Sequence, residues 1–398
     1  MISTAVISHG ISARTFHIPF ITTHLGFSLD MILERTGDTA KQQYPHIKLA
    51  RTIEEVLNDP TIELVVICSP NETHFPYAKA ALLAGKHVVV EKPFTNTSAE
   101  AKELIALSGS TGKVCSVYQN RRYVTDFLTM KKIVDDGILG EPREFFAHYD
   151  RYRPDPRTYG LWREQELPGS GIFYDLGPHL IDQALMLFGK PTYISADIRR
   201  MKPYSKVDDC FDVKLEYDNL IVTLHASMLV REMGPRYMIH GTKGSYIKSG
   251  EDPQEELLKA GAKPIGPDWG KEDSSIHGLI HTEVDGEIIR RPYPSLQASY
   301  GDYYKNLYST IKNGAPLKET PLDGYNVIRL IELAFQSSKE KRTITCSCLS
   351  GIHCCLWCPS FVSTKATSPL RCSYQPNGFL IPTFFATLLY PTRDLLFL

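Results

Sequence analysis

Residues 5–13 read Ala-Val-Ile-Ser-His-Gly-Ile-Ser-Ala, a short apolar strand followed by a turn of small residues and then a helix-compatible stretch. This is the position of a dinucleotide-binding turn, whose pattern is Gly-x-Gly-x-x-Gly/Ala. Ser8, Gly10 and Ala13 hold the three pattern positions, so the first glycine is missing. The match is weak on its own. Its place after the first strand predicts that the backbone N–H groups of residues 11–13 meet a pyrophosphate at a helix N-terminus.

Apolar strands alternate with helical segments through the first 120 residues. We expect strands at residues 27–33, 63–68, 88–90 and 114–118, and helices at 52–57 and 74–83. Strands that alternate with helices at short spacing are typical of a parallel, doubly wound sheet. The sequence therefore predicts an α/β protein in which residues 1–121 form a Rossmann-type dinucleotide-binding domain.

Two charged residues follow the second strand, about 20 residues after the turn. Glu34 can hydrogen-bond a ribose 2′-hydroxyl and so favour NAD, whereas Arg35 can hold the 2′-phosphate of NADP. The alternative is an ordinary surface pair of opposite charges. We expect NAD(P) as the cofactor, with NAD or NADP left undecided and both accepted.

A lysine ends the most apolar of these strands. Residues 85–93 read GKHVVVEKP, so Lys92 lies at the carboxyl end of a buried parallel strand, where open α/β sheets bind their ligands. There, partial burial can lower the pKa of a lysine and suit it to proton chemistry. The alternative is a solvated residue that opens a loop.

The segment 169–185 offers an acid–base pair. If it is helical, Asp175 and His179 lie on one face at a spacing of four residues, and Pro178 predicts a kink or a helix start nearby. A histidine held by a carboxylate is a common general base. The alternative is that the aspartate caps the helix and the histidine is a satisfied core residue.

Alternating apolar and polar residues predict further strands after the first domain. They are expected at residues 144–150, 193–199, 212–216, 220–226 and 236–239, with a hairpin turn at 218–219, and amphipathic helices are expected at 303–307 and 327–335. Residues 122–345 are therefore expected to form an α+β domain with a large open, mostly antiparallel sheet that needs one face covered.

The combination of residues 8–13 (SHGISA), 69–74 (SPNETH), 91–93 (EKP) and Asp175-x-x-x-His179 closely resembles the Gfo/Idh/MocA family of pyridine-nucleotide oxidoreductases. The resemblance covers residues 3–345. Residues 119–123 (QNRRY), 162–165 (WREQ), 240–245 (HGTKGS) and 252–256 (DPQEE) resemble a branch that includes NADP-dependent scyllo-inositol dehydrogenases. Ser8, Val124 and everything after residue 345 depart from the family pattern, and Val124 puts part of the substrate pocket in doubt.

The resemblance implies roles for particular residues. Lys92 would contact the nicotinamide ribose and the substrate hydroxyl, His179 would accept or donate the proton, and Asp175 would orient the substrate. The cofactor would be bound by Gly10, Ile11, Ser12, Ala13, Glu34, Arg35, Ser69, Pro70, Asn71, His74, Glu91, Lys92, Gln119 and Asn120. Candidate substrate contacts are Arg122, Tyr123, Arg153, Trp162 and Arg163, each of which has a structural role as its alternative.

These residues predict an oxidoreductase that transfers a hydride between nicotinamide and a secondary alcohol or ketone of a sugar, cyclitol or related polyol. The rival hypothesis is a dinucleotide-binding sensor or regulator on the same fold, which would need the cleft but no acid–base set. The resemblance also implies a homodimer or higher homo-oligomer, in which a second subunit covers the open sheet.

The composition of the 398-residue chain argues against other classes. A formal net charge of −1 gives no basic field for nucleic acid or an anionic membrane. Residues 1–10 lack the pattern of a signal peptide, and no stretch is long and apolar enough to span a bilayer. Three scattered cysteines before residue 346 indicate a reduced compartment, so we expect a cytoplasmic protein.

The last 53 residues differ from the rest. Residues 346–398 contain six of the nine cysteines, few charges and no periodicity. Their Cys-x-Cys and Cys-x-x-Cys spacings match no paired zinc site well, and we expect no metal. We interpret this tail as a disordered extension or translated non-coding sequence, and we expect that truncation at residue 345 leaves folding and cofactor affinity unchanged.

Overall fold

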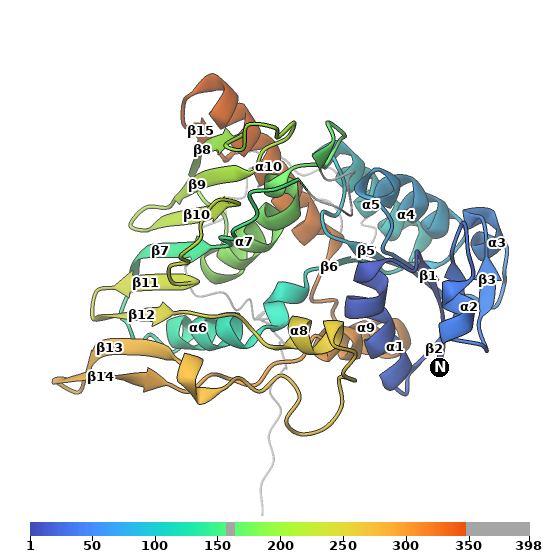
Figure 1. The fold of residues 1–398 in the computed structure, drawn as a ribbon, viewed down its shortest axis with the longest axis horizontal. Coiled ribbons are helices and arrows are strands. Elements are labelled where there is room, and N and C mark those ends of the chain that lie inside the picture. The colour runs from blue at the N-terminus through green and yellow to red at the C-terminus, as the bar shows by residue number, and fades with distance from the viewer. Residues whose placement is uncertain (157–163, 348–398) are drawn as a thin grey trace, which may run out of the picture. The chain divides into compact units, whose positions relative to one another are not determined.

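The structure is a computed structural model that describes residues 1–156 and 164–347, and these contain two β-sheets (Figure 1). The first is the predicted parallel sheet, with the order β3-β2-β1-β4-β5-β6. Its strands are β1 (Ile2–Ile7), β2 (Phe27–Leu33), β3 (Lys48–Ala50), β4 (Leu64–Ile67), β5 (His87–Glu91) and β6 (Cys115–Tyr118). The order reverses between β1 and β4, which makes this the switch point where such sheets bind ligands.

Burial explains why these segments form central strands. Val88, Val89 and Val90 in β5 have no exposed surface, as expected for a strand covered on both faces. The connecting helical segments are η1 (a π-helix, Ala13–His17), α1 (Ile18–Thr23), α2 (Thr39–Gln43), α3 (Ile53–Leu57), η2 (Asn71–Thr73), α4 (His74–Leu83), α5 (Ser98–Thr111) and η3 (Asn120–Tyr123). The predicted doubly wound architecture is confirmed.

The second sheet has nine strands in the order β14-β13-β12-β11-β7-β10-β9-β8-β15. It is mostly antiparallel, with one parallel pair between β7 and β10. Its strands are β7 (Pro142–His148), β8 (Tyr193–Arg199), β9 (Cys210–Glu216), β10 (Ile221–Ser227), β11 (Tyr237–Gly241), β12 (Gly244–Lys248), β13 (Gly278–Val284), β14 (Glu287–Tyr293) and β15 (Ile344–Thr345). The predicted hairpin appears as the β9–β10 pair, in which Val213 faces Leu224.

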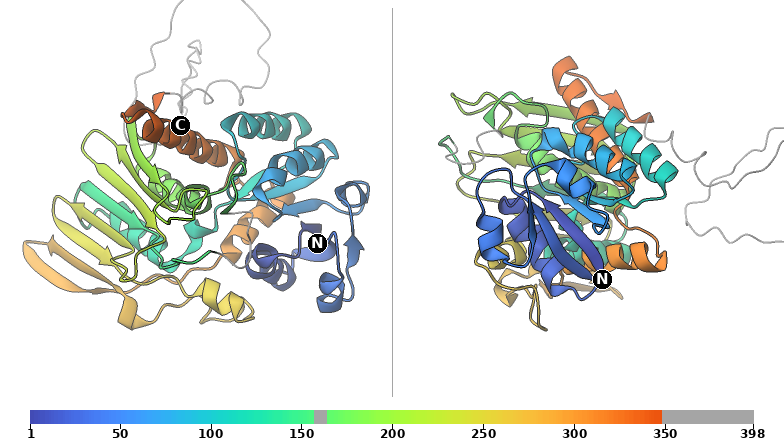
Figure 2. Two further views of the ribbon diagram at one scale, coloured as in Figure 1. Left: turned by 45° about the horizontal axis from the view of Figure 1, so that its top comes forward. Right: turned by 90° about the vertical axis from the view of Figure 1, so that its right-hand side faces the viewer.

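Helices pack on one face of this sheet. Those that contact its strands are α7 (Ile172–Phe188) and α10 (Pro321–Glu340). The other helical segments of this half are α6 (Thr125–Asp135), α8 (Gln254–Lys259), the short turn η5 (Ser274–Ile276) and α9 (Gly301–Asn313), and α9 packs against α1 of the first half. Phe173 of α7 meets Phe211 of β9 with ring centroids 4.8 Å apart. Figure 2 shows α7 and α10 on this side, and no helix of the described residues on the opposite face. One face of the sheet is therefore open.

The last helix connects the two halves. A capping box between Thr320 and Asp323 begins α10, which packs on both α5 and β8. β15 follows it, and the buried Cys346 donates its N–H to the carbonyl of Thr192. The folded body therefore includes the first of the six tail cysteines. In the described ranges, no helix is long and apolar enough to cross a membrane.

Candidate functional site

A cleft of about 480 Å³ opens at the carboxyl ends of the parallel strands. Residues that follow β1, β4, β5 and β6 line it together with the start of α7. From the predicted set, its lining includes Gly10, Ile11, Ser12, Ser69, Pro70, Asn71, His74, Glu91, Lys92, Asn120, Arg153, Asp175 and His179. Residues far apart in the sequence thus converge because the parallel strands bring their carboxyl ends to one edge.

Lys92 and Asp175 form an ion pair in this cleft. The Lys92 Nζ atom lies 2.7 Å from the Asp175 carbonyl oxygen and 3.1 Å from its Oδ1. Both side chains are largely shielded, with exposed fractions of 17% and 21%. The α7 backbone therefore holds the lysine ammonium beside the carboxylate.

His179 lies one turn after Asp175 on α7, and Pro178 is accommodated inside the helix six residues after its start. The helix begins after Gly171, and the Asp208 carboxylate accepts the N–H of Phe173 at 2.7 Å, which caps it from another loop. Proline lacks an N–H, so the helix loses one bond there but continues. The helix therefore starts at Ile172 and runs through Pro178, instead of starting at the proline.

The surroundings of His179 favour its neutral form. Its ring is buried, and its Nδ1 atom has no hydrogen-bond partner among the described residues. Burial holds the pKa of His179 well below its usual value, and the charges of Lys92 and Arg121 add to this effect. The Asp175 carboxylate opposes them without reversing the shift. A neutral imidazole can accept a proton.

The turn after β1 has the predicted form despite its missing glycine. Ser8 adopts a φ of +97°, a conformation that favours glycine, and its hydroxyl accepts the N–H of Gly10 at 3.1 Å. Ala13 is buried and starts η1. The Ser8 hydroxyl therefore stabilises a turn in which the pattern has glycine, while the positive φ strains the Ser8 backbone.

Glu91 is the centre of a buried network that the sequence did not indicate. It accepts hydrogen bonds from Ser12 and from the N–H of Lys92, and His17 Nε2 lies 3.0 Å from its Oε1. On the other side of the ring, His17 Nδ1 is 2.7 Å from the Tyr304 hydroxyl. Burial would raise the pKa of Glu91, but His17, Lys92 and Ser12 outweigh it and lower the pKa to about 2.

The loop after β4 is tied to its surroundings through two side chains. Asn71 donates from Nδ2 to the Gly169 carbonyl at 2.7 Å. The ring nitrogens of His74 face the carbonyls of Pro93 and Ser69, at 2.7 and 3.0 Å. Both residues line the cleft, yet these contacts show that they also fix the loop.

Four of the predicted cofactor residues do not line the cleft: Ala13, Glu34, Arg35 and Gln119. Glu34 and Arg35 are not among the cleft-lining residues, and Glu34 accepts hydrogen bonds from the Thr39 hydroxyl and the Ala40 N–H. Desolvation opposes these bonds, but the pKa of Glu34 still lies below its usual value. Asn120 lines the cleft, whereas its neighbour Gln119 is buried, and the Gln119 Oε1 atom is without a partner in the described ranges.

The predicted substrate contacts separate into three groups. Arg153 lines the cleft. The buried Arg122 instead forms two hydrogen bonds to Asp182, at 2.6 and 2.7 Å, and Tyr123 donates to Glu319. Trp162 and Arg163 lie outside the described residues. The sequence missed Arg121 and Arg151, which line the cleft; the run of two arginines at 121–122 did not reveal which one faces it.

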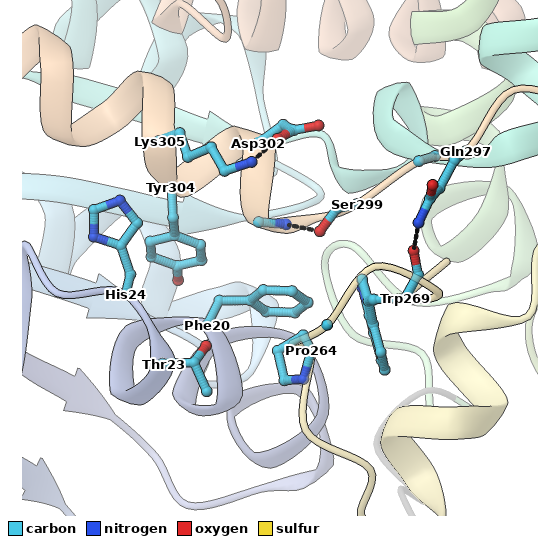
Figure 3. Close-up of a pocket in the computed structure, with 13 residues that line it drawn as sticks. Phe20, Thr23, His24, Pro264, Trp269, Gln297, Ser299, Asp302, Tyr304 and Lys305 are labelled. Atoms are coloured by element: carbon cyan, nitrogen blue, oxygen red, sulfur yellow. Dashed lines mark hydrogen bonds and ion pairs between the residues drawn. The ribbon is translucent and has the colours of Figure 1, made fainter. Parts of the chain in front are cut away.

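A second pocket, of about 390 Å³, lies between α1 and the start of α9 (Figure 3). Phe20, His24, Trp269 and Tyr304 contribute its rings. None of the predicted site residues lines it. Over the described part of the chain, no group of three or more His, Cys, Asp or Glu side chains is arranged to hold a metal ion.

The residues of the cleft fit a dinucleotide. An added Cβ at Gly10 would lie 3.2 Å from the Ser8 hydroxyl, a tight contact, and the absence of a side chain at Gly10 lets a pyrophosphate approach the backbone closely. The N–H groups that follow Gly10 belong to the start of a helical segment, and such groups can bind an anion. Gly10, Ile11 and Ser12 would hold the pyrophosphate, and the Gln119 amide next to Asn120 offers an unused acceptor.

Two family descriptions match the chain. Residues 2–119 match the NAD-binding Rossmann fold of the Gfo/Idh/MocA oxidoreductase family, and residues 131–346 match its C-terminal alpha/beta domain.

Relatives extend this match over nearly the whole described body. The chain is 41% identical to the uncharacterized oxidoreductase YdgJ of Escherichia coli, over 86% of this chain and 98% of YdgJ. It is 38% identical to scyllo-inositol 2-dehydrogenase (NADP(+)) IolW of Bacillus subtilis, over 86% and 95%. The crystal structure of an oxidoreductase from Bacillus cereus superposes with a TM-score of 0.81 at 35% identity, covering 89% of this chain and all of that one. The chain is an oxidoreductase that belongs to the Gfo/Idh/MocA family and binds NAD(P).

Proposed function

We propose that this protein transfers a hydride between nicotinamide and a secondary alcohol or ketone of a sugar, cyclitol or related polyol. The observation that carries the proposal is the convergence of Lys92, Asp175 and His179 in the cleft that also holds the dinucleotide-binding turn. A sensor needs the turn but not this set, so the arrangement favours an enzyme over a regulator. The name of the relative IolW supports a cyclitol or similar polyol.

The proton chemistry belongs to His179. In oxidation, the His179 imidazole would accept the proton of the substrate hydroxyl as the carbon that bears it gives up a hydride, which leaves a ketone. In reduction, the protonated imidazole returns the proton. When bound, the nicotinamide supplies the hydride chemistry.

Lys92 and Asp175 position the alcohol. The ammonium of Lys92 donates to the substrate hydroxyl oxygen and stabilises the negative charge that develops as the proton leaves. Asp175 holds that ammonium and accepts from a neighbouring substrate hydroxyl. The buried Glu91 network keeps the backbone of Lys92 in place, through the hydrogen bond from its N–H.

We further propose a homodimer or higher homo-oligomer formed through the open face of the nine-stranded sheet. Ile221 at the start of β10 is 51% exposed, and a second subunit on the open face would cover this apolar side chain. Analytical ultracentrifugation checks this proposal, and a monomer at micromolar concentration would contradict it.

The substrate proposal is tested by a panel of inositols, pentoses, hexoses and their ketones, assayed with NAD⁺ and NADP⁺ and their reduced forms. We expect turnover, followed by the absorbance of reduced nicotinamide, with at least one polyol or its ketone. Cofactor binding without turnover of any panel member would favour the sensor.

A further inference from the structure

The charges along the cleft do not cancel. Five basic side chains line it against three acidic ones: Lys92, Arg121, Arg151, Arg153 and Lys259 against Glu91, Asp175 and Glu255. The acidic groups are already engaged. Asp175 pairs with Lys92, Glu255 pairs with both Arg121 and Lys259, and Glu91 bonds to His17.

Arg151 is the cation left over. Its guanidinium forms no hydrogen bond or ion pair with any other residue that the structure describes, although the side chain is partly buried at the cleft. Its backbone is held firmly, because its N–H donates to the Ser227 carbonyl at 2.9 Å and its carbonyl accepts from Val230. A partly buried guanidinium without a counter-charge on a fixed backbone indicates an anionic ligand group.

The extended chain places Arg151 and Arg153 on the same side. Alternate residues of an extended segment point to opposite faces, and Tyr152 between the two arginines is 40% exposed, with Arg231 stacked over its ring at 3.9 Å. Arg153 also lines an adjoining recess with Gly171 and Asp175, and no residue of the 8–13 turn lines that recess. The two arginines therefore belong to the substrate end of the cleft, where α7 begins.

The field around the reacting group has the same sign. The cations Lys92, Arg121 and Arg236 all act on His179, and the Asp175 carboxylate opposes them. A cleft with an excess of one charge raises the local concentration of ligands of opposite charge.

We propose that the substrate is an anionic polyol, a polyhydroxylated molecule with a carboxylate or phosphate group that pairs with Arg151. This rests on the proposed function, since it names the substrate class of the same site. A guanidinium binds either group through two parallel hydrogen bonds, and Arg151 lines the same cleft as Lys92, Asp175 and His179. The hydroxylated end then faces Lys92 and His179.

The test compares matched ligands by calorimetry on the full chain saturated with NADP⁺. The pairs are D-gluconate with D-glucitol, and myo-inositol 1-phosphate with myo-inositol. We expect the anionic member of at least one pair to bind about 10-fold or more tightly than its neutral partner, as a charge-assisted bidentate contact provides. Preference within the first pair alone identifies a carboxylate, and within the second alone a phosphate.

Variants connect this preference to one residue. We expect Arg151→Gln to abolish the preference and Arg151→Lys to keep part of it, while the neutral ligands bind all three proteins alike. Arg143→Gln is the matched control, because Arg143 is a partly exposed arginine near the start of β7, the strand that precedes Arg151, and it pairs with Glu141 outside the cleft. It should leave the preference unchanged.

The outcomes separate this inference from the proposed function. Equal binding within both pairs, or an unchanged preference in Arg151→Gln, overturns the anionic-substrate inference even if neutral polyols are oxidised. An Arg151-dependent preference in a protein that turns over no polyol of either kind supports the anionic ligand and contradicts the dehydrogenase.

Discussion

At the scale of single residues, Ser8 shows how a departure from a motif can be tolerated. Its φ of +97° is strained for a residue with a Cβ, and its hydroxyl offsets some of that strain by accepting the Gly10 N–H. We expect Ser8→Gly to be more stable than Ser8→Ala by about 1–2 kcal/mol, because both lose the hydroxyl and only glycine adopts this φ freely. Urea unfolding of the two variants measures the difference, and equal stabilities would refute the strain.

We predict that the choice between NAD and NADP depends on Glu34 and Arg35, two adjacent residues that do not line the cleft. The Glu34 carboxylate already accepts hydrogen bonds from the Thr39 hydroxyl and the Ala40 N–H, so a ribose hydroxyl would have to share it with them. Arg35 is exposed and can reach a phosphate. We expect use of both cofactors, with Glu34→Ala weakening NAD about 10-fold more than NADP and Arg35→Ala doing the reverse. Titration of each variant with each cofactor decides it; identical shifts would show that neither residue reads the 2′ position.

The sequence allowed the position of a residue in the fold to be predicted where the order of strands and helices dictates it, while the catalytic roles of these residues stay predictions. Lys92, Asp175 and His179 share one cleft as expected, because β5 and α7 deliver them to the same edge. Hydrogen bonds and ion pairs between segments far apart in the sequence could not be predicted. Nothing local to His17 or Arg122 distinguishes a network residue from a core or site residue, since their partners Glu91 and Asp182 lie 74 and 60 positions away.

At the scale of elements, the ion pair of Arg122 and Asp182 ties η3 to α7. Both side chains are nearly fully buried, and Asp182 lies on the helix that carries Asp175 and His179. Burial would lower the pKa of Arg122, but Asp182 outweighs it and the pKa is raised. The arrangement suggests a structural role for an arginine that the resemblance offers as a substrate contact.

We expect Arg122→Gln to destabilise the protein by about 3–5 kcal/mol, since it leaves the Asp182 carboxylate buried without its cation. Thermal unfolding measures this loss, and Lys131→Gln, which removes an exposed ion pair with Asp135, is the control. A raised KM for substrate with unchanged stability would instead assign Arg122 to substrate binding.

Element bounds were predictable where burial imposed a clear pattern. The strand at 27–33 and the helix at 74–83 coincide with β2 and α4. β14 gave no signal, because its residues are mostly exposed and lack the alternation of a half-buried strand. β12 and β13 were missed with it. The parallel pairing of β7 with β10 could be seen only in the structure, since hydrophobic periodicity does not reveal which strands pair or in which direction.

At the scale of the molecule, the folded body ends beyond the expected boundary. Cys346 is buried and bonded to Thr192, so truncation after residue 345 removes a contact that truncation after Ser347 keeps. We expect the protein truncated after Ser347 to retain the full chain's melting temperature and cofactor affinity. Truncation after Lys341, which removes β15, should lower the melting temperature by several degrees. Failure of the Ser347 truncation to fold, or stoichiometric zinc in the full chain, would show that the tail has a role.

The central claim is that His179 is the proton acceptor of a nicotinamide-dependent alcohol oxidation. The measurement is kcat/KM for oxidation against pH, for the wild type and His179→Ala, with cofactor affinity titrated in parallel and Lys92→Ala as the companion variant. A base works only when unprotonated, so the lowered pKa of His179 should preserve wild-type activity below the usual histidine range and lose it as the pH falls further. His179→Ala should lose about 10²–10⁴-fold in rate, lose this acid limb and bind cofactor as the wild type does, whereas Lys92→Ala should lose both rate and affinity. Wild-type turnover with an unchanged pH profile in His179→Ala would contradict the account.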